Sequence, residues 1–169
     1  MNLQLFPTGE NRMVTGFEPI CDEHSKVLVL GSFPSVISRK VGFYYGNKRN
    51  RFWGLISEIY GEPAGEDAES KTAFLLRNGI ALWDIVEKCE IRGSEDGSIR
   101  NESVVDLNVI LSSAPISAIV CNGKKSYAEL SAKYPSLPQK IYCLPSTSPA
   151  NVSFDKEKWL AAFREIRNV

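Results

Sequence analysis

The stretch KVLVLGSFPS occupies residues 26–35 and passes from an apolar run into a loop of small residues. After Lys26 the run is continuously apolar rather than alternating, which is typical of a parallel strand buried on both faces. Three further runs share this character, namely IALW at 80–83, ISAIVC at 116–121 and KIYCL at 140–144. Helical patterns lie at 50–60, 67–77, 104–111, 124–134 and 155–166. Strands that alternate with helices predict an α/β protein, with an open parallel sheet and helices on both of its faces.

Length and composition are those of an ordinary globular protein. The chain has 169 residues, of which 43% are hydrophobic and 24% charged, so we expect a single domain over residues 1–169. No apolar run approaches the ~20 residues of a membrane span. The first fifteen residues lack the basic and apolar regions of a signal peptide. We therefore expect a soluble, cytoplasmic protein without membrane partners. The polar stretch RGSEDGSIRNE at 92–102 predicts a loop.

The cysteines and the single histidine argue against metal and nucleophilic chemistry. Cys21, Cys89, Cys121 and Cys143 include no pair spaced two residues apart, so zinc-finger and thioredoxin spacings are absent. Cys121 and Cys143 lie in apolar runs, and we expect both to be small core residues. His24 lies in the polar stretch CDEHSK and is expected to be a solvated loop residue, which excludes a Ser-His-Asp hydrolase built on another histidine. We expect no metal and no cofactor.

The 20 basic and 20 acidic residues are unevenly distributed along the chain. Between residues 24 and 57 there are six basic residues and no acidic one, whereas residues 58–69 carry five acidic residues. Aromatic residues such as Phe43, Tyr44 and Tyr45 are interleaved with the basic block. Charge runs are usually solvated faces. A basic block with aromatic residues also suits a polyanion whose bases stack on the protein. Composition alone leaves both interpretations open.

Ligands of an open α/β sheet bind beyond the carboxyl ends of its strands, and two loops there are distinctive. The loop after the first strand reads GSFPSVIS at 31–38 and continues as GFYYGNKRNRFW at 42–53. It contains neither a P-loop nor a GxGxxG pattern. The loop after the last strand reads LPSTSPAN at 144–151, where two prolines stiffen the chain and three hydroxyls can hold phosphate oxygens. Taken alone, this second loop is equally an ordinary turn before a helix.

Together the two loops resemble motifs one and two of the uracil-DNA glycosylase superfamily, whose fold is a three-layer α/β/α sandwich with a central four-stranded parallel sheet. Gly31, Pro34, Gly42-Phe43 and Asn50-Arg51-Phe52-Trp53 match the first motif of its mismatch-specific uracil/thymine branch, and residues 145–148 match the second. The asparagine that activates water in that branch falls on Phe33. The hypoxanthine-DNA glycosylase (deoxyinosine glycosylase) family has an apolar residue there, and the chain resembles that family from about residue 16 to residue 159.

The resemblance implies roles for residues around the first motif. Phe33 can neither hold nor polarise a water, so the best remaining water-holder is Asn50, the residue implicated in catalysis in the resembling family. Asn50 also suits the N-cap of the helix that follows it. Tyr45 takes the position of the aromatic that stacks on the flipped base, with a core aromatic as the alternative. The backbone N–H groups of Ser32 and Phe33 are expected to contact the base edge.

Base choice is expected to depend on Asp84, which follows the run at 80–83. In the superfamily's best-known uracil enzymes, an asparagine follows this strand and reads uracil. A carboxylate accepts hydrogen bonds but does not donate them, so it suits N1–H of hypoxanthine and would repel O4 of uracil. The alternative is that Asp84 caps a turn or a helix. Asn122 ends the third strand, where it either orients a loop or touches DNA.

DNA contacts are implied for both motifs. The residues expected to make them are Ser146, Thr147, Ser148 and Asn151 in the second motif, and Lys48, Arg49, Arg51 and Lys124 as phosphate contacts. These contacts position the protein on DNA and do not specify the base.

The implied function is repair of DNA that contains a deaminated base. The protein would flip the base, which is expected to be hypoxanthine, and hydrolyse its N-glycosidic bond to leave an abasic site. Because no lysine takes a motif position as a Schiff-base nucleophile, we expect a monofunctional enzyme. We also expect a monomer that acts in the cytosol of a bacterium or archaeon. The alternatives are a uracil or mismatch-specific uracil/thymine DNA glycosylase, and a non-catalytic nucleic-acid-binding module on the same fold.

Overall fold

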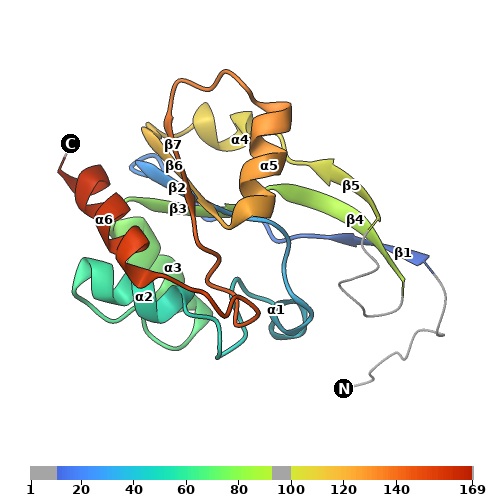
Figure 1. Ribbon diagram of the computed structural model, residues 1–169, viewed down its shortest axis with the longest axis horizontal. Coiled ribbons are helices and arrows are strands. Elements are labelled where there is room, and N and C mark those ends of the chain that lie inside the picture. The colour runs from blue at the N-terminus through green and yellow to red at the C-terminus, as the bar shows by residue number, and fades with distance from the viewer. Residues whose placement is uncertain (1–10, 93–99, 169) are drawn as a thin grey trace.

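A four-stranded parallel sheet forms the centre of the computed structural model, which describes residues 11–92 and 100–168 (Figure 1). The strand order is β3-β2-β6-β7. The strands are β2 (Val27–Gly31), β3 (Ile80–Asp84), β6 (Ala118–Asn122) and β7 (Lys140–Leu144). All four predicted strands are thus confirmed. Every residue of β2, β3 and β6 is buried, and because both faces of these strands are covered, their sequences are continuously apolar.

Helices cover both faces of this sheet, which confirms the predicted three-layer α/β/α sandwich (Figure 1). On one face lie α2 (Phe52–Tyr60), α3 (Ala68–Arg77) and α6 (Lys156–Arg167), where α3 contacts β3 and α6 contacts both β7 and α2. On the other face, α5 (Lys124–Lys133) packs on β6 and β7, and α4 (Asn108–Leu111) lies on the same side. A short helix that the sequence did not predict, α1 (Val36–Val41), follows β2.

Helix α6 illustrates how the helices are fixed to the sheet and to the loops. Trp159 and Phe163 lie one turn apart on its inward face, where both are fully buried and their rings stack with centroids 6.1 Å apart. The indole Nε1 of Trp159 donates a hydrogen bond to the carbonyl oxygen of Pro145 at 2.8 Å. Truncating a buried aromatic residue of this kind to alanine costs ~3–5 kcal/mol. The same side chain therefore stabilises the core and holds the loop after β7.

A second, antiparallel sheet lies beside the first and is absent from the sequence-based prediction. Its order is β1-β4-β5, and it consists of β1 (Asn11–Thr15), β4 (Val86–Arg92) and β5 (Arg100–Val104). The predicted loop at 92–102 and the predicted helix at 104–111 are therefore wrong in part, because Arg100–Val104 is a strand and the helix is reduced to α4. Strand β5 is held by backbone pairing with β4, and its residues are exposed or half-buried, so its sequence carries little hydrophobic signal. Residues 93–99 of the predicted loop lie outside the described residues.

One core prediction is also wrong. Cys121 is buried, but Cys143 is exposed, although the two residues are paired in register between β6 and β7. The reason is that β7 is an edge strand of the sheet and only its last residue, Leu144, is buried. An apolar run at an edge does not imply that both faces are covered. His24 is exposed, as predicted, with 77% of its side chain accessible.

The parallel register brings the carboxyl ends of all four strands to one edge of the sheet. Gly31 is paired with Asp84 across β2 and β3, and Asn122 is paired with Leu144 across β6 and β7. The loops that carry both predicted motifs begin at this edge. In the described ranges, no helix combines the length and the apolar character that crossing a membrane requires.

Candidate active site

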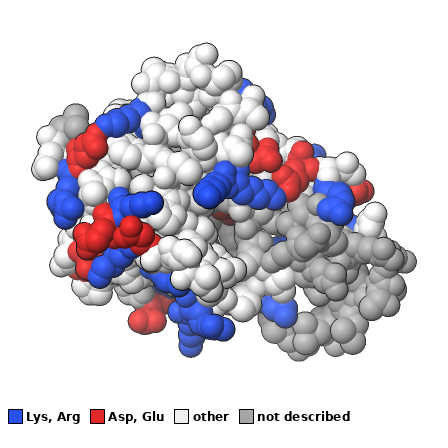
Figure 2. Space-filling model, in the orientation of Figure 1, with Lys and Arg blue, Asp and Glu red and all other residues white. Residues whose placement is uncertain are grey.

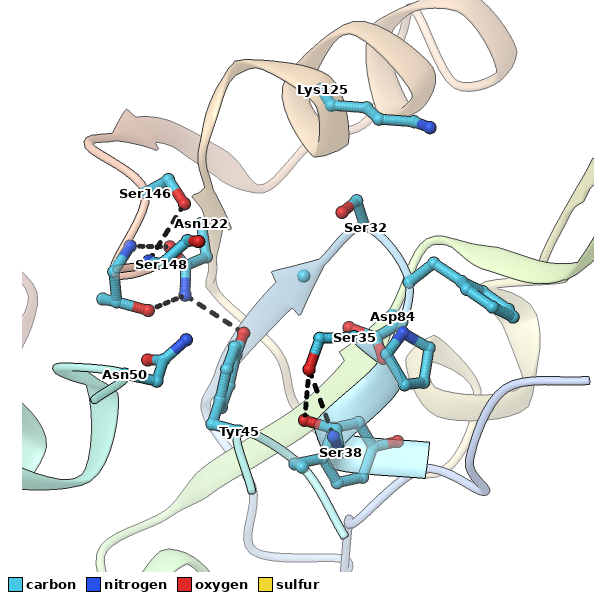
Figure 3. A pocket seen from close by; sticks show the side chains of 15 residues that line it. Ser32, Ser35, Ser38, Tyr45, Asn50, Asp84, Asn122, Lys125, Ser146 and Ser148 are labelled. Carbon is cyan, nitrogen blue, oxygen red and sulfur yellow. Dashed lines mark hydrogen bonds between the residues drawn. The ribbon is translucent and has the colours of Figure 1, made fainter. Parts of the chain in front are cut away.

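A cavity of about 230 Å³ opens at the carboxyl edge of the parallel sheet. The ends of β2, β3 and β6 meet there with the segment before α2 and the loop after β7 (Figure 3). Its volume is below the ~300–1,000 Å³ of sites for drug-sized ligands and suits a single nucleobase. The cavity is lined by Gly31, Ser32, Phe33, Pro34, Ser35, Ser38, Tyr44, Tyr45, Asn50, Asp84, Asn122, Lys125, Ser146, Thr147 and Ser148.

The structure brings most of the predicted site residues together in this lining. They are Ser32, Phe33, Tyr45, Asn50, Asp84, Ser146, Thr147 and Ser148. The other predicted residues, Lys48, Arg49, Arg51, Lys124 and Asn151, lie outside the lining. The roles assigned to all of these residues stay predictions, since the geometry fixes their positions and not their use.

Gly31 forms the centre of the cavity wall because it has no side chain. A Cβ atom at this position would lie 2.2 Å from Oδ1 of Asp84 and 2.9 Å from the hydroxyl oxygen of Tyr45. Real Cβ atoms do not approach other atoms so closely. The glycine of the first motif therefore leaves the space in which the carboxyl of Asp84 and the hydroxyl of Tyr45 both face the cavity.

Asp84 is a buried carboxyl that has no partner in the part of the chain that the structure describes. Its residue is 5% exposed, and among the described residues none donates a hydrogen bond to it or forms an ion pair with it. Burial raises the pKa of Asp84 from 3.8 to about 7, because the charged form loses its hydration without compensation. Near neutral pH the carboxyl is therefore present in both forms. The prediction treated it as a charged acceptor, whereas the neutral form can also donate.

Tyr45 is held in an unusual backbone conformation against the cavity. Its φ angle is +50°, in the left-handed region that costs a non-glycine residue about 1–3 kcal/mol. Its ring packs on Phe52 with centroids 4.3 Å apart. Burial, and the nearby carboxyl of Asp84, raise the pKa of the phenol, so the hydroxyl keeps its proton. Tyr45 thus both packs on the core and lines the cavity, and the two interpretations of its role are compatible.

Asn122 joins the two motifs, which the sequence analysis left open. Its Nδ2 donates to the Tyr45 hydroxyl at 3.1 Å and to Oγ1 of Thr147 at 2.9 Å. Its Oδ1 accepts from the backbone N–H of Thr147 at 3.0 Å. The whole amide is therefore used to fix Tyr45 of the first motif against Thr147 of the second (Figure 3). A polar residue at the end of an otherwise apolar strand was the signal in the sequence.

Asn50 lies two residues before helix α2 and also faces the cavity. Its Oδ1 accepts from the backbone N–H of Phe52 at 2.9 Å, but the N-cap of α2 is Arg51, so the predicted N-cap is wrong by one residue. This bond fixes the orientation of the amide, and the amide nitrogen of Asn50 points towards Tyr45 and Asn122 in Figure 3. The hydrogen bond from Phe52 and a contact with water or substrate can therefore coexist in one side chain.

Arg51 and Asn151 make internal bonds that shape the second motif. The backbone N–H of Arg51 donates to the carbonyl of Thr147 at 3.1 Å, and its Nη1 donates to the carbonyl of Ser148 at 2.9 Å. Nδ2 of Asn151 donates to the carbonyl of Ser146 at 3.0 Å. Thr147 itself is 1% exposed and is bonded to Asn122. These side chains hold the loop in shape, whereas Ser146 and Ser148 are half-buried beside the cavity.

Exposed cations occur among the predicted phosphate contacts. Lys48, Arg49 and Lys124 are exposed, as phosphate contacts require. Lys125, which lines the cavity from α5, forms an ion pair with Glu102 of β5, with Nζ and Oε1 2.6 Å apart. Basic and acidic side chains are interspersed on the face seen in Figure 2. Affinity for DNA would therefore depend on a few local cations rather than on the net charge of zero.

Several lining residues were missed by the sequence analysis. Tyr44 is 3% exposed and donates its hydroxyl to the carbonyl of Glu18 at 2.6 Å. Ser35 caps α1 by accepting from the backbone N–H of Ser38 at 3.1 Å. These contacts form only in the folded chain, so they leave no distinctive pattern in the sequence. Within the described ranges, no group of three or more His, Cys, Asp or Glu residues is placed to hold a metal ion.

Comparison with known families identifies the class of protein. The profile of the Uracil DNA glycosylase superfamily matches residues 18–168, which is nearly the whole chain. The chain belongs to this superfamily. Membership confirms the family that the two motifs predict, and with it the predicted class of enzyme, a DNA glycosylase.

Relatives within the superfamily match over most of their length. A protein of Methanosarcina acetivorans named hypoxanthine DNA glycosylase is 35% identical over 154 residues, which are 88% of this chain and 97% of the relative. A protein of Methanosarcina barkeri with the same name is 32% identical with the same coverage. The NMR solution structure of a Methanosarcina acetivorans protein, described as a candidate uracil DNA glycosylase, superposes with a TM-score of 0.80 at 32% identity and covers 92% of this chain and 99% of its own.

Proposed function

We propose that this protein is a monofunctional hypoxanthine DNA glycosylase. It takes deoxyinosine out of DNA, hydrolyses the bond between N9 of hypoxanthine and C1′ of the sugar, and leaves an abasic site. The observation that carries this proposal is a base-sized cavity with an unpartnered carboxyl, Asp84, in its wall. The two relatives named hypoxanthine DNA glycosylase support the same substrate.

The base must leave the duplex to enter this cavity, since C1′ is out of reach inside the stack. In our proposal the flipped base stacks on Tyr45, an interaction worth about 1–3 kcal/mol. Asn122 supports it by holding the Tyr45 hydroxyl and the second motif in fixed positions. Because these groups are already oriented before DNA binds, little ordering is needed when the base enters.

Hydrolysis requires a water near C1′ once the bond to the base weakens. Phe33 occupies the position of the usual water-holder and offers no hydrogen bond. In our proposal the amide of Asn50 takes over, since its nitrogen points into the cavity while its oxygen accepts from the backbone N–H of Phe52. The water oxygen forms the new bond to C1′, and the electron pair of the broken bond leaves with the base.

A lyase step is not part of this proposal. Lys125 lines the cavity, but its ammonium is paired with Glu102 at 2.6 Å. An amine nucleophile must be free and deprotonated, so we expect the reaction to stop at the abasic site.

Uracil is the second candidate substrate, and a specific observation favours it. A charged carboxylate would repel O4 of uracil, but burial raises the pKa of Asp84 to about 7, and its neutral form can donate to that oxygen. We therefore expect any uracil excision to increase as the pH falls below 7.

A nicking assay tests the proposal. Duplex oligonucleotides that each carry one inosine, uracil or xanthine are incubated with the protein, and alkali then cleaves the strand at abasic sites. Cleavage of the inosine strand only after alkali is the expected result. Intact inosine strands at every pH tested would contradict the proposal, and cleavage without alkali would contradict the monofunctional reaction.

The setting of the reaction completes the proposal. We propose that the chain acts as one domain and as a monomer, on DNA in the cytosol. Sedimentation with and without a duplex tests that state.

A further inference from the structure

The surroundings of the Asp84 carboxyl point to a role beyond a hydrogen bond to the base. Its carboxyl lies at the end of β3, directly across from Gly31 of β2, whose missing side chain opens the space in front of Oδ1. The residue is 5% exposed, lines the cavity, and receives no hydrogen bond from any described residue. Buried polar groups normally have a hydrogen-bond partner, so this carboxyl is available to interact with a group from outside the protein.

The groups around Asp84 do not stabilise its charge. Tyr44 and Tyr45 face it from the segment before α2, and both have raised pKa values and stay neutral. Asn122 of β6 uses its whole amide on Tyr45 and Thr147. Charged groups on neighbouring elements include the carboxyl of Glu18 near Tyr44, Arg39 of α1 over the ring of Phe33, and Lys125 of α5 in its ion pair with Glu102. Glu87 and Lys88 of β4 are exposed.

We propose that Asp84 is the general acid of the reaction: its neutral carboxyl donates a proton to N7 of the flipped hypoxanthine as the bond from N9 to C1′ breaks. This rests on the proposed function. A departing purine carries the electron pair of the broken bond as negative charge in its five-membered ring. Protonation of N7 makes the leaving base neutral, and general acids of this kind contribute about 10²–10⁴-fold to rates.

The proton balance of the step is complete without a further reactant. The N9–C1′ pair of electrons moves into the purine, the carboxyl O–H bond breaks, and the proton forms the N7–H bond. Water then forms the C1′–O bond and loses one proton, which returns to the Asp84 carboxylate directly or through solvent. The products are hypoxanthine and an abasic sugar, and Asp84 is again neutral. The pKa of about 7 makes the neutral form available at the working pH.

The proposal and the charged-acceptor interpretation predict opposite pH dependence. If Asp84 donates its proton, the single-turnover rate on inosine should fall about tenfold per pH unit above a pH of about 7. If its carboxylate instead accepts from N1–H, the rate should rise with pH through the same range. The pH profile of the wild-type rate decides between the two interpretations, so this test does not depend on whether a variant folds.

Asp84→Asn keeps the shape of the side chain but cannot donate an acidic proton. On inosine it should be about 10²–10⁴-fold slower and should lose the fall above pH 7. On 7-deaza-2′-deoxyinosine, which lacks the N7 acceptor, wild type and variant should be equally slow. Asp106→Asn is the matched control: this exposed residue accepts a hydrogen bond from the backbone N–H of Asn108, and the substitution should leave the pH profile unchanged.

Three results would overturn the assignment. They are a rate that rises with pH, a variant that retains the wild-type profile, and equal losses on inosine and on the 7-deaza substrate. Each of them leaves inosine excision itself intact. Absence of inosine excision by the wild type at every pH would instead contradict the proposed function, so the two failures are distinguishable.

Discussion

Replacing Asp84 by Asn should stabilise the folded protein, and by an amount that grows with pH. The pKa of this carboxyl is about 7 in the folded state against 3.8 for an ordinary aspartate. Since the folded value is raised, the stability contributed by Asp84 is fully present below the unfolded pKa and is lost as the pH rises through the folded pKa. The shift of about three units corresponds to about 4 kcal/mol, at about 1.4 kcal/mol per unit.

The variant removes this loss because an amide does not ionise. At pH 5 the wild type has already lost about 1.5 kcal/mol of the total, and by pH 8.5 it has lost nearly all of it. The gap between Asp84→Asn and wild type should therefore widen by roughly 2.5 kcal/mol between these two pH values. This is a large part of the ~5–15 kcal/mol by which domains are stable.

Urea unfolding of both proteins at pH 5 and pH 8.5, followed by tryptophan fluorescence, measures this gap. Titrations of other carboxyls cancel in the difference between variant and wild type, and Asp106→Asn, an exposed site, should show no such widening. If the difference in unfolding free energy between variant and wild type stays constant with pH, the conclusion that the carboxyl is buried and unpaired is refuted. A gap of opposite sign at pH 8.5 would indicate a partner that stabilises the charged form.

Three further predictions concern the lining and the rim of the cavity. Asn50→Ala should lower inosine excision by about 100-fold or more, and Asn50→Asp, which retains an acceptor for the backbone N–H of Phe52, should lose as much. A near-normal rate in Asn50→Asp would leave Asn50 only this structural role. Gly31→Ala places a Cβ atom 2.2 Å from Oδ1 of Asp84 and should slow excision by about 100-fold through displacement of that carboxyl. Gly54→Ala, where a Cβ atom meets nothing within 4 Å, is its control, and equal rates for both variants would contradict the argument. Replacing Lys48 and Arg49 by Gln should reduce the slope of log affinity against log salt by about two without changing base preference, whereas an unchanged slope would place the phosphate contacts elsewhere.

The parallel sheet could be predicted from the sequence because burial alone determines its composition. Strands β2, β3 and β6 are covered on both faces, and each appears as a continuous apolar run. Strand β5 has no such signature, because RNESV is polar and its residues are exposed or half-buried. Backbone pairing with β4 holds it, and this pairing leaves no pattern in the side chains. Cys143 fails for a related reason, since β7 lies at the edge of the sheet.

The site was predictable as a set of loops but not as a set of contacts. The two motifs named most of the lining residues because their order along the chain follows the family pattern. The bonds that join them, from Asn122 to Tyr45 and Thr147 and from Arg51 to Ser148, connect residues 25 to 97 positions apart. Such pairings exist only once the strands are aligned. The protonation state of Asp84 likewise depends on the groups that surround it in the folded protein, and its position in the sequence does not reveal them.

The energetics of Asp84 connect stability to catalysis. A buried carboxyl with no partner among the described residues destabilises the protein increasingly as the pH rises from 3.8 to about 7. Nearby donors that could correct this are directed elsewhere: Asn122 bonds Tyr45 and Thr147, and Lys125 bonds Glu102. A donor placed against Asp84 would hold it charged, stabilise the fold and remove its ability to give a proton. Gly31 acts in the same direction, since its missing side chain keeps the space in front of the carboxyl open at a cost to backbone stability. Proton donation requires a carboxyl that no neighbour stabilises in its charged form, and the lower stability of the fold around Asp84 follows from this requirement.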